Sequence, residues 1–166
     1  SESGQGINFH AHGSGTNIDS NVLDDYEIGK FTPYFKIEGR DVSNSPVDNV
    51  DATYVKVGQM VTCHYTITCN GNPTNAATTR AWEIRGFPFQ SKNDISNGYI
   101  SAGQRVDGYS TGTYGPDGYF LFRIFNHSTY GRLEFIDSNH TGTRNASMMM
   151  ADNATVMGTI TYQTDS

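Results

Sequence analysis

The 166-residue chain lacks the features that several functional classes require. It carries 11 Lys and Arg against 17 Asp and Glu, for a formal net charge of −6, and its cations are scattered singly. Phosphate binding needs clustered positive charge, so nucleic acid is not an expected partner. No run of eighteen apolar residues occurs, so we expect no membrane-embedded segment.

Cysteine is also scarce, because the chain has only Cys63 and Cys69. Both fall at even spacing in a run typical of one strand, and their side chains therefore point the same way. Such a strand places them about 20 Å apart, which is far beyond the reach of a disulfide. We expect two reduced core residues, consistent with assembly in a reducing cytoplasm.

Patterns of catalytic residues are missing as well. The chain has no G-x-S-x-G, P-loop or H-E-x-x-H motif, no Cys–His nucleophile pattern, and no carboxylate pair spaced for glycoside cleavage. His64, His127 and His140 are isolated from one another in the sequence, and we interpret each as structural. The sequence therefore predicts a protein that binds and does not catalyse.

What the chain does have is typical of β structure. Gly (18), Tyr (10) and Phe (9) are plentiful, which favours strands joined by tight turns. The clearest strand is Met60–Cys69, where apolar and polar residues alternate strictly. The side chains that we expect in the core from this strand are Val61, Cys63, Tyr65, Ile67 and Cys69.

Other strands are expected between polar, turn-rich loops. They cover residues 31–39, 52–59, 81–89, 119–125, 133–137 and 156–162. Pro33 indicates an edge or a bulge, since proline has no N–H to donate to a ladder. Residues 119–125 are apolar on both faces, which is typical of a central strand covered on two sides. We predict one antiparallel β-sandwich domain over residues 23–166.

Residues 1–22 differ from the rest, because they have no apolar period and few large apolar residues. Such a segment cannot offset its ordering entropy alone. We predict an extended N-terminal arm that is either disordered or packed against another copy.

The stretch 99–118 is the most suggestive of binding, because its tyrosines alternate with Gly, Ser, Thr and Asp. Tyrosine offers a flat apolar face and a hydroxyl at low entropic cost, as binding loops require. The candidate ligand-binding residues are Asp107, Tyr109, Tyr114 and Asp117. The alternative is that these tyrosines are ordinary sheet residues beside turns.

Four segments in order resemble the C-terminal domains of tailed-phage tail fibres and other virion appendages. LDDYEIGKFTP (23–33) is similar to their LDDYEEGTWTP-type opening, and TYVKVGQMVTCHYTITC (53–69), EIRGFPF (83–89) and MADNATVMGTITY (150–162) are similar to later motifs. Ile28, Lys30 and Phe31 depart from the usual opening, and residues 99–118 match no family motif.

The resemblance implies a homotrimeric, jelly-roll-like β-sandwich in the virion, joined to other fibre or tail proteins. It also implies attachment to the host bacterium through a surface glycan or an outer-membrane component. Two alternatives stay open. One is a capsid-decorating or fibre-capping trimerisation domain without a ligand, and the other is a carbohydrate-binding module of a bacterial secreted protein.

The pair His10 and His12 is a candidate metal site in such a trimer. Residues two apart on an extended strand share a face, so three chains around an axis would supply six imidazoles to a divalent transition metal. Some phage fibre tips resemble this arrangement, with iron on the axis. The alternative is two solvated histidines in a flexible arm.

Overall fold

We describe the fold from a computed structural model, which describes residues 7–8, 22–23, 26–37, 40–41, 47–69, 82–93, 98–109, 118–137, 143–145 and 150–165. Over these residues the chain forms strands and turns and no helix. The strands are β1 (Ile7–Asn8), β2 (Val22–Leu23), β3 (Tyr26–Lys30), β4 (Tyr34–Ile37), β5 (Arg40–Asp41), β6 (Val47–Val57), β7 (Met60–Cys69), β8 (Trp82–Arg85), β9 (Tyr99–Tyr109), β10 (Gly118–Ile124), β11 (Tyr130–Asp137), β12 (Thr143–Asn145) and β13 (Met150–Gln163).

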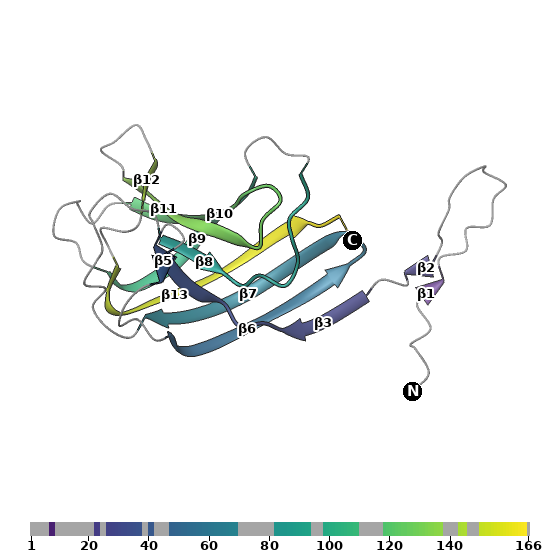
Figure 1. The fold of residues 1–166 in the computed structure, drawn as a ribbon, viewed down its shortest axis with the longest axis horizontal. Helices are drawn as coiled ribbons and strands as arrows, with labels where there is room; N and C mark the ends of the chain where they lie inside the picture. Colours follow the sequence, from purple (N-terminus) through teal and green to yellow (C-terminus); the bar gives the residue numbers. More distant parts are fainter. Residues whose placement is uncertain are drawn as a thin grey trace.

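Every ladder among these strands is antiparallel. The main sheet has the order β3-β6-β7-β13-β9-β10-β11-β8-β4-β5, with β12 paired to β11, and β1 and β2 form a separate pair (Figure 1). The all-β, antiparallel prediction is therefore confirmed. No helix in the described part of the chain is long and apolar enough to cross a membrane.

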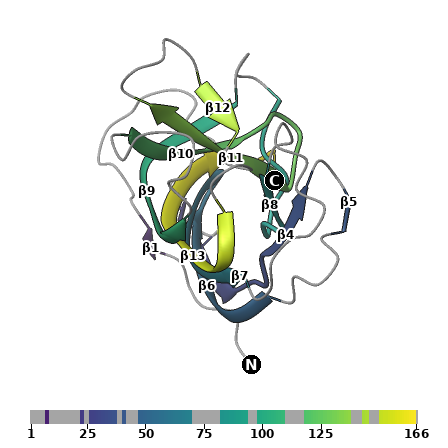
Figure 2. The same ribbon diagram turned by 90° about the vertical axis from the view of Figure 1, so that its left-hand side faces the viewer.

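The main sheet curls into a half-barrel around its core, as the view along the strands shows (Figure 2). At one turn of the curl, β9 pairs with β13 through its second half and with β10 through its first half, and its register with β10 shifts between Phe120 and Leu121. At the opposite side, Phe31–Pro33 connect β3 directly to β4, although these strands stand far apart in the sheet order. The expected strand over residues 31–39 is thus interrupted, because Pro33 cannot donate to a ladder.

Strand β7 follows its predicted pattern. Its alternate side chains from Val61 to Cys69 are buried, while Met60 and His64 are exposed. Cys63 and Cys69 are both free and buried, as expected. Burial raises the pKa of the Cys63 thiol to about 12 against a hydrogen bond from Tyr162 that lowers it.

The core between the two sides of the curl is rich in aromatic rings. Phe87 lies at its centre and stacks on Phe122 at 5.4 Å between ring centroids, with Tyr65 and Tyr162 edge-on at 5.9 and 6.4 Å. The residue before it, Gly86, has φ 86°, and a Cβ there would lie 2.7 Å from the Thr32 carbonyl oxygen. A glycine is therefore needed to turn the chain inward at Phe87, which is buried in the core.

Candidate functional site

A groove opens where β9 and β13 separate. The two strands pair through Thr155, Val156 and Met157 of β13. Beyond Met157, β13 continues along β7, whereas residues 99–104 of β9 pair with β10 instead. The space between the diverging strands is an open groove of about 490 Å³. We call it the fork groove.

The side chains that line the fork groove come from four strands. They are Asp51, Thr53, His64, Tyr65, Thr66, Ser101, Gln104, Met157, Gly158 and Thr159. This set contains one carboxylate, one imidazole, one amide and several hydroxyls, and it contains no Lys or Arg. The groove is thus polar and carries a single formal negative charge.

A directed chain of hydrogen bonds forms the groove floor. The Tyr65 hydroxyl donates to Gln104 Oε1 at 2.6 Å, and Gln104 Nε2 donates to Ser101 Oγ at 3.2 Å. The Ser101 hydroxyl in turn donates to the Thr159 carbonyl oxygen at 2.5 Å. Burial raises the pKa of Tyr65 well above its ordinary value, so this phenol remains a neutral donor.

Gly158 makes room for this floor. Gln104 is only 5% exposed, and a Cβ at position 158 would lie 1.5 Å from its Oε1 atom and 3.0 Å from the Tyr65 hydroxyl. No real side chain tolerates the first distance without displacing the amide. The glycine therefore lets a buried glutamine bridge the two separating strands.

The wall on β7 and β13 holds His64, whose Nδ1 lies 2.8 Å from Thr159 Oγ1. Further along the same face, threonine hydroxyls pair with one another across the strands, at 3.0 Å between Thr62 and Thr161 and 2.9 Å between Thr68 and Thr155. Those hydroxyls and the His64–Thr159 pair already have partners within the sheet, so a ligand would bind through the remaining lone pairs and protons of the groove. Its chemistry is that of reversible hydrogen bonding to a polar molecule.

Asp107, the one predicted ligand-binding residue whose side chain is described, lies beside the groove and does not line it. It is exposed on β9, opposite Thr155, and its carboxylate accepts a hydrogen bond from Arg105 Nε at 3.0 Å. Tyr109 ends β9 and pairs with Met150, and its side chain lies outside the described part. Residues 99–109, proposed as part of a binding loop, are therefore a strand.

The remaining predicted site residues lie outside the described ranges. They are Tyr114, Asp117, His10 and His12. Among the residues that the structure does describe, no group of three or more His, Cys, Asp or Glu side chains is arranged to hold a metal ion. The metal prediction at His10 and His12 stays untested.

Sequence reasoning missed the groove residues Ser101, Gln104 and His64. His64 had a usable signal, since it falls on the threonine-rich outer face of the clearest strand. Ser101 and Gln104 had none, because their positions depend on β9 leaving β13 to join β10. That change of partner is a property of the tertiary structure.

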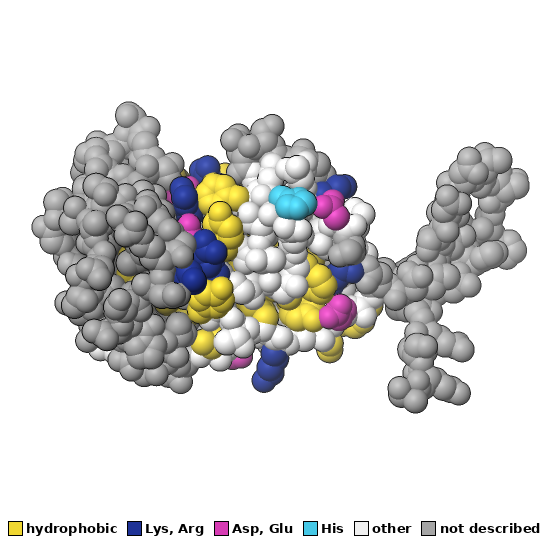
Figure 3. All heavy atoms as spheres, in the orientation of Figure 1, with side chains coloured by type: hydrophobic (Ala, Val, Ile, Leu, Met, Phe, Trp, Pro, Cys, Tyr) yellow, Lys and Arg dark blue, Asp and Glu magenta, His cyan; other side chains and the backbone are white. Residues whose placement is uncertain are grey.

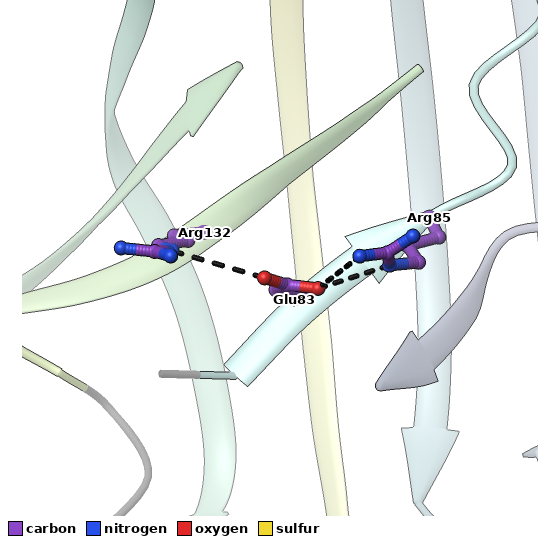
Figure 4. Close-up of polar contacts among 3 residues, drawn as sticks. All are labelled: Glu83, Arg85 and Arg132. Atoms are coloured by element: carbon purple, nitrogen blue, oxygen red, sulfur yellow. Dashed lines mark hydrogen bonds and ion pairs between the residues drawn. The ribbon is translucent and has the colours of Figure 1, made fainter. Parts of the chain in front are cut away.

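A second polar cluster lies on the outer face of β8 and β11, where Glu83 is only 2% exposed (Figure 4). Arg85 donates to Glu83 Oε2 from Nε and Nη2 at 2.9 and 2.7 Å, and Arg132 Nε lies 3.8 Å from Oε1. The guanidinium groups also cover aromatic rings, Arg85 over Tyr130 at 4.3 Å and Arg132 over Phe125 at 5.1 Å. We call this set the arginine–glutamate cluster.

Three arginines that stand singly in the sequence, Arg85, Arg123 and Arg132, thus lie on neighbouring strands of the fold. Figure 3 shows dark blue Lys and Arg side chains beside yellow hydrophobic ones in one part of the view and single cations elsewhere. The donors of Arg85 point at a buried carboxylate on the same strand, and Arg123 Nη2 contacts Glu134 Oε2 at 3.0 Å. The Arg132–Glu83 and Arg123–Glu134 contacts join neighbouring strands, which makes them structural elements of the sheet.

No family model, curated protein sequence or solved structure matches the chain. The resemblance to phage appendage domains therefore rests on the sequence motifs at residues 23–33, 53–69, 83–89 and 150–162. In the structure, these segments contribute strands β3, β6, β7, β8 and β13 to one sheet.

Proposed function

We propose that this chain is the distal domain of a tailed-phage virion appendage that attaches to the host bacterium by binding a surface glycan. The fork groove is the observation that carries the glycan part. It is an open site whose hydroxyl, amide, imidazole and carboxylate groups are the partners that sugar hydroxyls need. The motif resemblance supplies the biological setting.

We also propose that the domain forms a homotrimer. In each copy, the two sides of the curled sheet are proposed to form a jelly-roll-like β-sandwich. Support comes from an exposed apolar patch on β3, β6 and β7. Tyr26 (59% exposed) stands in register with Val57, which pairs with Met60, and Ile28 (64% exposed) stands beside Val55. Contiguous exposed apolar side chains of this kind mark interaction surfaces, and a second copy is the occupant that the trimer supplies.

A trimer would turn weak sugar binding into firm attachment. Three grooves on one rigid body raise the overall avidity by orders of magnitude without any new contact. The segment containing Asp107, Tyr109, Tyr114 and Asp117 is proposed to add contacts to the receptor. In the same trimer His10 and His12 are proposed to bind a divalent metal, and elemental analysis that finds no metal in purified protein would remove this part.

Two measurements test the proposal. Light scattering at micromolar concentration should give a mass near three times 18.2 kDa. Fluorescently labelled protein should be retained by some strains in a panel of bacteria, and periodate oxidation of the cell-surface sugars should abolish that retention. Equal retention before and after periodate would contradict glycan attachment, and a monomer would contradict the trimer.

Specific features favour each alternative. The apolar patch suits a structural trimerisation domain, which would be a trimer that no bacterial strain retains. The fork groove suits a carbohydrate-binding module of a bacterial secreted protein, which would be a sugar-binding monomer. The mass and the retention together separate the three readings.

A further inference from the structure

We infer that the fork groove selects a sugar ring that donates hydrogen bonds and carries no acidic group, and that it binds acidic sugars poorly. This inference rests on the proposed glycan binding and names the ligand class and the residues that recognise it. It follows from the charge of the groove, from the direction of its hydrogen bonds and from the shape of its floor.

The charge of the groove disfavours anions. Asp51 is exposed at the groove, and neither Lys nor Arg belongs to the lining. The adjacent cations in strand register are Lys30, opposite Thr53, and Arg105, which is held by Asp107 at 3.0 Å. A carboxylate or phosphate on the ligand would therefore meet acceptors and a like charge within the groove, which is costly.

The direction of the floor hydrogen bonds leaves acceptors facing the ligand. The proton of Tyr65 goes to Gln104 Oε1, the amide N–H goes to Ser101, and the proton of Ser101 goes to the Thr159 carbonyl. The protons of these hydrogen bonds are therefore all directed into the floor. Ser101 Oγ keeps a lone pair that faces the groove, and Asp51 is acceptor-only when ionised. At this floor the ligand supplies the protons, as the ring hydroxyls of a sugar can.

The shape of the site suits one face of a ring. Gly158 leaves room for the Gln104 amide in the floor, and Met157 adds a flexible apolar surface that can cover the C–H face of a sugar. Gln104 is a positioning residue: it holds Ser101 in place and does not need to touch the ligand.

The test is an NMR titration of the intact, isotope-labelled chain with defined sugars. The probes are the methyl glycosides of glucose, galactose, mannose and N-acetylglucosamine, compared with glucuronic acid, galacturonic acid and cationic glucosamine. We expect at least one neutral glycoside to bind saturably, with the largest shifts at Ser101, Thr159 and the Gln104 side-chain amide. We expect the matching uronic acid to bind at least tenfold more weakly.

Two variants and one control locate the site. Ser101→Ala removes the acceptor and should weaken the best neutral sugar at least fivefold, and Gln104→Glu should weaken it further by placing a charge in the floor. Asp165→Asn, which changes an exposed carboxylate outside the groove, should leave the affinity unchanged. Spectra of each variant show whether the fold is kept.

Several outcomes would overturn the inference. These are uronic acids binding as tightly as the neutral sugars, cationic glucosamine binding no more tightly than the uronic acids, no saturable binding of any neutral sugar, or shifts that map away from the groove. If cells still retain the protein in a periodate-sensitive way while hexoses fail to bind the groove, the inference is wrong and the proposed attachment stands. If a hexose fills the groove but no strain retains the protein, the attachment is wrong.

Discussion

The two sides of the curled sheet share one core but differ on their outer faces. On β6, β7 and β13 the outward side chains are largely threonine and carry little charge, and this face holds the fork groove. On β8, β10 and β11 the outward side chains form ion pairs and cation–aromatic contacts centred on Glu83 and Glu134. The polar groups of the second face are joined mainly by ion pairs, whereas those of the first face are joined by neutral hydrogen bonds that leave lone pairs open to a ligand.

Because of this difference, we expect substitutions on β8, β10 and β11 to affect mainly stability and substitutions on β6, β7 and β13 to affect mainly binding. Glu83 is buried at 2% exposure beneath its arginine partners, so its loss leaves charges without a counterion. His64 and Thr159 are exposed, so changing either alters the groove more than it alters the fold. The predictions below test that division.

The largest effect is expected from replacing glycine by alanine, and this substitution is compared on the two sides of the curled sheet. In Gly131→Ala, the new Cβ would lie 2.3 Å from the Arg123 carbonyl oxygen and 2.5 Å from Phe122 Cζ, so backbone must move. We expect a loss of about 3 kcal/mol in the free energy of unfolding, measured by chemical denaturation.

Gly158→Ala is the matched control. Its nearest neighbour is the Gln104 side chain, which can rotate away, and we expect a smaller loss of about 1 kcal/mol together with loss of sugar binding. Equal destabilisation by the two alanines would mean that the groove floor is as rigid as the backbone of β10 and β11.

The next effect is expected from Glu83→Gln, which leaves the guanidinium groups of Arg85 and Arg132 without their carboxylate. Because Glu83 is buried while the arginines are partly exposed, we expect a loss of about 2 kcal/mol and unchanged sugar affinity. Thr66→Val on the opposite face should cost less than about 0.5 kcal/mol, by thermal unfolding. A larger loss in the threonine variant than in the glutamine variant would reverse the assignment.

The last effect is expected from alkaline pH, which acts on the shared core. The pKa of Cys63 is about 12 in the folded chain because of burial, against an ordinary value of 9.0. Above pH 9 the unfolded chain loses this proton while the folded chain keeps it, so stability falls as pH rises. We expect this thiol to lower the free energy of unfolding by about 1.4 kcal/mol at pH 10 relative to pH 8.

Denaturation curves at the two pH values measure the loss, and Cys63→Ala should remove the part that the thiol contributes, while the phenols of Tyr65 and Tyr162, whose pKa values burial also raises, still lower the stability. A stability that does not change between pH 8 and 10 in the unaltered chain would mean that the thiol is not desolvated. Coincident transitions reported by different probes would show that both sides unfold with their common core.

Local pattern was enough to predict part of this fold. The alternation in Met60–Cys69 identified the buried face of β7, and the expected strand over residues 81–89 contains β8. These elements obey the period of two that any half-buried strand follows. The interruption at Pro33 was indicated only as an edge or a bulge.

The candidate site was beyond the reach of local pattern. Ser101 and Gln104 enter the groove because one strand pairs with two partners, and no period in the sequence encodes such a change. In the arginine–glutamate cluster, Glu83 and Arg85 are two residues apart on one strand and share a face, but Arg132 reaches the same carboxylate only because β11 pairs with β8. Pairing of distant strands, and not local propensity, therefore places Ser101, Gln104 and Arg132.

A co-crystal of the chain with its best-binding neutral methyl glycoside tests the central claim most directly. The account expects electron density for the sugar between β9 and β13, with ring hydroxyls within hydrogen-bond distance of Ser101 Oγ and of the Asp51 or Thr159 side chain. Density for the sugar over the arginine–glutamate cluster or against residues 110–117, with the fork groove empty, would contradict the account.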